Sequence, residues 1–102
     1  MAFPIERNLQ KLQDREIIGT QCDAAVDCWF TAGGKTMPRL CKLKGPQEEI
    51  ITIQNISVMK EEQKFYAGIH AKKHWCKAEH NGVMMQFYLV FYPEECRWKI
   101  VI

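Results

Sequence analysis

The sequence predicts a mainly β protein: an antiparallel meander of about six strands that forms a small barrel or curved roll, with one short N-terminal α-helix. From residue 23 onward, apolar residues alternate with polar ones, which is the period of a half-buried strand. Turn residues recur about every 8–12 residues in much of this stretch, as in small barrels. The chain has 102 residues, so we expect a single domain over residues 1–102, with the β region over 23–102.

A helix is predicted over residues 4–16. Pro4 suits the first turn of a helix, and Ile5, Leu9 and Leu12 recur at spacings of four and three residues. These spacings place the three apolar side chains on one face. The segment therefore has the pattern of a short amphipathic helix.

The first strand is predicted over residues 24–31. Its alternation places Val26, Cys28 and Phe30 on one face. Gly33–Gly34 follows as a tight turn, because glycine readily adopts the positive φ angles that hairpin turns need.

The second strand is predicted over residues 37–44, with an edge position or a bulge near Pro38, because proline cannot donate a hydrogen bond to a neighbouring strand. The alternation divides its side chains between two faces, with Arg39, Cys41 and Leu43 on one and Leu40, Lys42 and Lys44 on the other. Four further strands are predicted over residues 49–58, 65–69, 83–92 and 96–102, with a polar turn at 59–63 and an Asn81–Gly82 hairpin turn.

Composition and charge indicate an ordinary globular protein. Apolar residues make up 47% of the chain, charged residues 25%, and the formal net charge is +2. The five cysteines are an odd, scattered set without a C-x-x-C pair, which favours a reducing compartment. The N-terminus lacks the apolar run of a secretory signal, and the longest apolar run is too short to span a membrane as a helix. We expect a cytoplasmic protein without a membrane partner.

The pattern over residues 26–38 is a tryptophan strand that leads into a glycine turn and then a proline: Val26, Cys28, Trp29, Phe30, Thr31, Ala32, Gly33, Gly34 and Pro38. In this order of residues the chain resembles small uncharacterised β-proteins of anaerobic Gram-positive bacteria. The later Phe65–Tyr66 and Arg97–Ile100 segments are similar in order. The resemblance implies a compact β-fold in an intracellular bacterial setting, and it implies no activity.

One cluster has the residue types of a metal site: His70, His74, Cys76 and His80. Imidazole and thiolate groups are natural zinc ligands, and the even spacing would place all four on one face of a strand. In an extended strand, however, the first and last would lie about 30 Å apart. The alternative interpretation is a solvated basic hairpin, and the sequence predicts no cofactor.

A second hypothesis is that the protein binds single-stranded nucleic acid. Small β-barrels bind single strands through exposed aromatic side chains set among basic ones. The corresponding residues here are Lys42, Lys44, Lys73, Trp75 and Lys77. A domain of this size also needs most of its aromatic residues for its core.

The preferred prediction is a small cytoplasmic protein-interaction module. The segment Met84–Tyr92 carries more apolar surface than a small barrel easily hides, so we expect either the N-terminal helix or another chain to cover its second face. The partner would be a second copy or a different protein. No arrangement of residues predicts catalysis, and we expect that the protein is not an enzyme.

Overall fold

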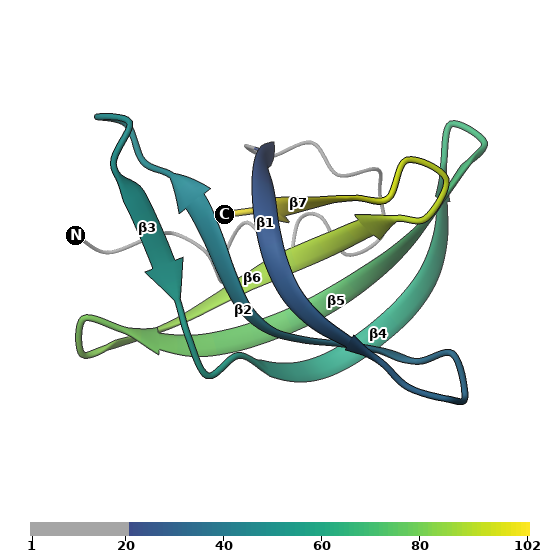
Figure 1. Cartoon of the computed structure of the whole chain (residues 1–102), viewed down its shortest axis with the longest axis horizontal. Helices are drawn as coiled ribbons and strands as arrows, with labels where there is room; N and C mark the ends of the chain where they lie inside the picture. Colours follow the sequence, from purple (N-terminus) through teal and green to yellow (C-terminus); the bar gives the residue numbers. More distant parts are fainter. Residues whose placement is uncertain (1–20) are drawn as a thin grey trace.

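The computed structural model describes residues 21–102, which form seven antiparallel β-strands in one sheet (Figure 1). The predicted helix over residues 4–16 lies outside the described residues. No helix within residues 21–102 is long and apolar enough to cross a membrane. The strands are β1 (Gln21–Phe30), β2 (Thr36–Lys44), β3 (Ile50–Ile53), β4 (Ser57–Tyr66), β5 (Ile69–His80), β6 (Val83–Tyr92) and β7 (Arg97–Val101).

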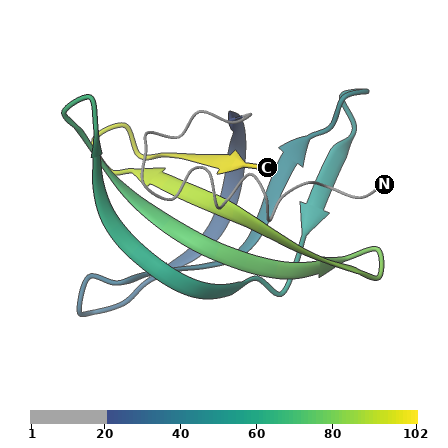
Figure 2. The same cartoon turned by 180° about the vertical axis from the view of Figure 1, so that it is seen from behind.

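The order of the strands in the sheet is β3-β2-β1-β7-β6-β5-β4. Strands that follow one another in the chain therefore pair, except for β3 and β4, and the first strand pairs with the last. Figures 1 and 2 show that the sheet is strongly curved, with β4 and β5 sweeping beneath the β2–β3 hairpin. The prediction of a mainly β, antiparallel fold is confirmed, with seven strands in place of about six, but β3 and β4 interrupt the predicted meander because they do not pair. The sheet is not closed, because β3 and β4 remain its two edges.

The centre of the chain differs from the predicted strand boundaries. The strand predicted over residues 49–58 is divided between β3 and β4 by Asn55, whose φ of 55° is left-handed. The polar turn predicted at residues 59–63 lies inside β4, and Ala67–Gly68 makes the turn instead, with φ angles of 51° and 83°. Residues 70–80, which have no clear alternation of apolar and polar types, belong to the twelve-residue strand β5.

A β-bulge in β2 moves Arg39 to the outer face of the sheet. Asp27 pairs with Leu40 and Cys28 pairs with Pro38, so Arg39 is an extra residue without a partner in β1. The bulge predicted near Pro38 is confirmed. The prediction that Arg39 shares a face with Cys41 and Leu43 is wrong, because the extra residue reverses the alternation at that point.

The core lies on the inner face of the curved sheet. Leu89 and Phe91 of β6 face it beside Trp98 and Ile100 of β7, and the Phe91 and Trp98 rings lie 4.8 Å apart. β6 is a central strand, since it pairs with β5 and β7 and is buried on both faces from Phe87 to Phe91. Its hairpin turn has positive φ at both Asn81 and Gly82.

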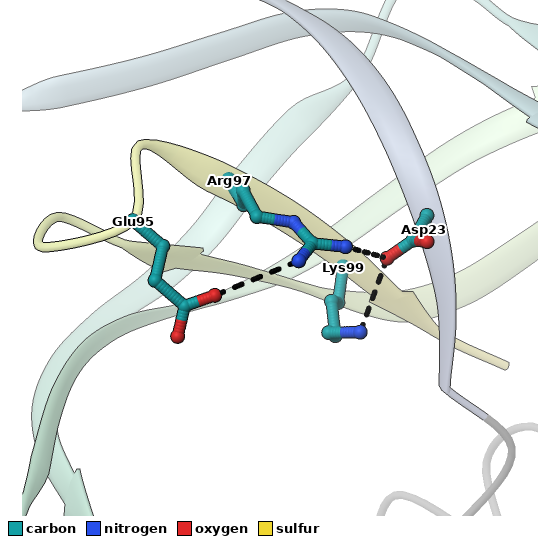
Figure 3. Close-up of polar contacts among 4 residues, drawn as sticks. All are labelled: Asp23, Glu95, Arg97 and Lys99. Carbon is teal, nitrogen blue, oxygen red and sulfur yellow. Dashed lines mark hydrogen bonds and ion pairs between the residues drawn. The ribbon is translucent and has the colours of Figure 1, made fainter.

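Charged side chains join the first and last strands on the outer face (Figure 3). Arg97 and Lys99 of β7 each place a nitrogen 3.1 Å from Oδ1 of Asp23 in β1. Glu95 lies 3.7 Å from the other side of the Arg97 guanidinium. The hydrogen bond and charge of Lys99, together with the charge of Arg97, hold the pKa of the Asp23 carboxyl below its ordinary value.

Candidate interaction surface

A cleft opens where the first half of β2 approaches the first half of β4. We call it the seam cleft, and define it by Thr36–Arg39 on one wall and Ser57–Glu61 on the other. Its volume is about 550 Å³. At one end, the backbone N–H of Ile56 donates to the carbonyl oxygen of Arg39 at 3.1 Å. β3 pairs only with the second half of β2, so the first half has a free edge here.

Four exposed apolar side chains border this cleft. We call them the seam patch: Trp29, Met37, Val58 and Met59, which are 59%, 45%, 37% and 43% exposed. Trp29 and Met37 face each other across the β1–β2 hairpin. In β4, Val58 pairs with Cys76 and Lys60 pairs with Trp75, so Met59 is the extra residue of a second bulge. The two bulges therefore bring exposed apolar side chains to the same cleft.

Three cations also line the cleft. The guanidinium carbon of Arg39 lies 4.7 Å from the centre of the Trp29 ring. Lys60 forms an ion pair with Glu62 at 3.6 Å. Lys35 and Arg39 form no ion pair with any other residue of the described range. Among the described residues that line the cleft, Glu61 is the single carboxylate, so the lining is positively charged.

A buried hydrogen bond lies beneath the cleft. Nδ1 of His74 donates to the carbonyl oxygen of Leu89 at 3.1 Å, so Nε2 is the acceptor nitrogen. The Thr36 hydroxyl lies 2.6 Å from this Nε2 and donates its single proton there. Glu61 is more distant, at 3.5 Å from the same hydroxyl. His74 is fully buried, and burial lowers its pKa, so the ring is neutral.

The four predicted metal ligands all lie on β5. Their side chains share one face of the strand, as predicted for an extended segment, but β5 continues without interruption and does not gather them: His70, His74, Cys76 and His80. Within residues 21–102, no three or more His, Cys, Asp or Glu side chains are grouped so that they could hold a metal ion. Burial raises the pKa of the Cys76 thiol, which disfavours the thiolate that zinc binds. The outer two histidines contact local partners, Gln63 for His70 and Asn81 for His80.

The predicted nucleic-acid residues lie on two separated strands. Lys42 and Lys44 are exposed on the outer face of β2, and Lys73, Trp75 and Lys77 share the outer face of β5. β1, β7 and β6 lie between these two strands in the sheet. Lys73 is buried with its ammonium 4.1 Å from the centre of the Tyr88 ring, and the Trp75 indole donates to Gln86. The structure does not bring the five residues together in one basic face.

Sequence reasoning missed the seam patch. The alternation that points Cys28 inward also points Trp29 outward, and this signal was available in the sequence. Met59 was assigned to a polar turn, because the lysines and glutamates around it conceal a strand. The surplus apolar surface predicted on residues 84–92 is mostly core: Phe87 to Phe91 are buried, and exposed apolar side chains remain only near the hairpin end, at Val83 and Met84.

Comparison of the chain with protein-family models, with curated proteins and with solved structures found no match in any of the three. The resemblance to small bacterial β-proteins therefore stays a prediction.

Proposed function

We propose that the protein is a protein-interaction module whose seam patch binds a segment of a partner protein. The observation that carries this proposal is the grouping of exposed Trp29, Met37, Val58 and Met59 around one cleft. Single exposed apolar residues are normal on a soluble domain, whereas a contiguous group beside a concave surface is typical of an interaction site.

The residue types support a protein partner. Tryptophan, methionine and arginine are enriched at protein interfaces, and tryptophan and arginine most often dominate the binding energy. Methionine side chains are flexible and polarisable, so Met37 and Met59 can adapt to the shape of an incoming side chain. The cleft volume of about 550 Å³ is sufficient for a few side chains of a partner.

The charges on the edge strand β4 favour a partner that binds through side chains over one that adds a strand to the sheet. An exposed edge strand offers unpaired backbone groups, and charged residues on that strand discourage pairing with another chain. β4 is an edge and carries the charged run Lys60–Lys64. Lys42 and Lys44, by contrast, lie where β2 is already paired with β3, so these lysines do not protect an edge.

The cytoplasmic setting is part of the same proposal. All five cysteines are free, which agrees with a reducing compartment. Cys41 and Cys76 are fully buried, and burial raises the pKa of Cys41 to about 12. These two thiols therefore act as small apolar side chains of the core.

The test is capture of partners by three forms of the protein. The wild-type chain is compared with the seam variant, Trp29→Ser/Met59→Ser, and with a control, the hairpin variant Val83→Ser/Met84→Ser, which removes two exposed apolar side chains at the β5–β6 hairpin. All captures are carried out after nuclease treatment. We expect that the wild type and the hairpin variant then retain the same proteins and that the seam variant loses them. Circular dichroism checks that all three are folded.

Two outcomes contradict the proposal. The first is an identical set of retained proteins for all three forms, which means that the seam patch contributes nothing. The second is loss of all retained proteins after nuclease treatment, which favours nucleic acid as the direct ligand.

A further inference from the structure

We infer that the occupant of the seam cleft is an acidic peptide segment, in which a large apolar side chain is flanked by carboxylates. This inference rests on the proposed function and specifies the chemistry of the partner. It is carried by the charges around the seam patch and by the placement of Arg39.

Arg39 is held so that it can bind a carboxylate. Its guanidinium lies over the face of the Trp29 ring, with 4.7 Å between the guanidinium carbon and the ring centre. A guanidinium that uses its face for stacking keeps its N–H donors, which lie in its plane, for other partners. Two parallel N–H groups of arginine match the two oxygens of a carboxylate. Since Arg39 has no ion pair with another described residue, this donor set is available to a ligand.

The remaining charges of the cleft also favour an acidic ligand. Lys35 lines the same cleft and, like Arg39, forms no ion pair within the described part of the chain. Lys60 forms an ion pair with Glu62, a carboxylate that it shares with Lys64. Glu61, the carboxylate of the lining, is only partly exposed and lies against Thr36. Among residues 21–102, Lys35 and Arg39 are therefore two cations without an ion pair beside the apolar centre of the cleft.

The apolar centre favours a peptide over a nucleic-acid strand. Proteins that bind single strands present successive aromatic platforms along a basic groove, on which bases stack one after another. Among the described lining residues, Trp29 is the one aromatic side chain, and its neighbours Met37, Val58 and Met59 are aliphatic. Such a surface suits a leucine or phenylalanine side chain inserted next to the tryptophan.

The first experiment selects ligands without assuming a sequence. Random heptapeptides displayed on phage are selected on the wild-type protein after depletion on Trp29→Ser/Met59→Ser. We expect the selected peptides to carry aspartate or glutamate on at least one side of an apolar residue. Selected peptides without acidic enrichment would overturn the inference while leaving the proposed function in place. If partner capture succeeds but no peptide is specific to the wild type, the inference is also wrong and the proposed function stands.

The second experiment measures the role of Arg39. Fluorescence polarisation compares a selected peptide with its analogue in which asparagine and glutamine replace the acids. Arg39→Gln should weaken binding of the acidic peptide about tenfold or more and leave the neutral analogue unaffected. Arg39→Lys should also weaken it, because a lysine cannot reproduce the paired donors. Lys42→Gln, on the same strand away from the cleft, is the matched control and should change binding less than about twofold.

Arg39 does not recognise a carboxylate if Arg39→Gln weakens binding of the acidic and the neutral peptide equally. The same conclusion follows if Lys42→Gln weakens binding of the acidic peptide as much as Arg39→Gln does. A single-stranded twelve-nucleotide oligothymidylate serves as a competitor. If it displaces the peptide at lower concentration than the unlabelled peptide itself, the cleft is a nucleic-acid site and the inference is wrong.

Discussion

The guanidinium of Arg39 lies over the Trp29 ring on the outer face of the sheet, although Arg39 belongs to a stretch that alternation places inside. The bulge opposite Asp27 and Cys28 produces this relationship, because it adds one residue to β2 and turns Arg39 outward. An exposed arginine stacked on an exposed tryptophan contributes little to the core. Its place beside the seam cleft makes it the centre of the proposed binding surface.

We expect Arg39→Ala to leave the fold almost unchanged. An exposed cation–π contact contributes about 0.5–1 kcal/mol, and the free energy of unfolding should fall by no more than that. Urea denaturation followed by tryptophan fluorescence measures the change. A loss several times larger would mean that Arg39 is a structural residue of the bulge, which weakens the argument for binding.

Thr36→Val should destabilise the protein by about 1–3 kcal/mol. The substitution keeps the shape of the side chain but removes the hydroxyl that donates to the buried Nε2 of His74, and a buried acceptor without a partner costs about this much. Thr52→Val, in β3, is the control, since the Thr52 side chain is half-exposed; its effect should stay within about 0.5 kcal/mol. Equal effects of the two changes in urea denaturation would show that the Thr36–His74 bond contributes nothing.

Stability should fall as the pH drops below about 6.5, the ordinary pKa of histidine. Burial lowers the pKa of His74 in the folded protein; the charge of Lys72 lowers it further, and hydrogen bonding and the charge of Glu61 only partly oppose this. Between the folded and unfolded pKa values the unfolded chain binds a proton that the folded protein does not. Stability is therefore full above the unfolded pKa and is lost below it.

The measurement is the urea midpoint between pH 7.5 and pH 5, a window chosen around the ordinary histidine pKa of about 6.5. His74→Gln should flatten the dependence of this midpoint on pH. If His74→Gln does not fold, the NMR titration of the His74 ring in the wild type replaces it. A ring that protonates above pH 6.5 would contradict the prediction.

Phe87→Ala should cost about 3–5 kcal/mol, because Phe87 is fully buried in the central strand β6 and its loss leaves a cavity. Phe65→Ala removes the same side chain from the end of β4, where Phe65 is 71% exposed, and should change stability by less than about 0.5 kcal/mol. Denaturation of the two variants side by side checks the assignment of core and surface. Similar losses at both positions would be inconsistent with the fold.

The sequence predicted the architecture where alternation and turn chemistry agree. Asn81–Gly82 predicted a hairpin turn that leads into a strand over residues 83–92, and the turn and β6 confirm this. Residues 70–80 could not be assigned in the same way. Lys73 and His74 are both buried in β5. Lys73 lies over the Tyr88 ring and His74 contacts Thr36, so contacts with residues distant in the sequence stabilise a polar stretch as a strand.

The candidate site was beyond prediction from the sequence because it depends on two bulges. Pro38 predicted a bulge in its neighbourhood, but the outward position of Arg39 and the bulge at Met59 are visible only when each strand is aligned with its partner, β1 for Arg39 and β5 for Met59. The alternation alone could predict that the Trp29 side chain faces outward. It could not place Trp29 of β1 at the same cleft as Met59 of the edge strand β4, since β7, β6 and β5 lie between these two strands in the sheet.

The most direct test of the seam patch is photo-crosslinking from two positions in living cells. Met59→p-benzoylphenylalanine places the reactive group at the cleft, and Met84→p-benzoylphenylalanine places it on an exposed methionine of the β5–β6 hairpin. We predict that irradiation joins a partner protein to position 59 and that the same product is absent from position 84. Crosslinks of equal yield from both positions, or from position 84 alone, would contradict it.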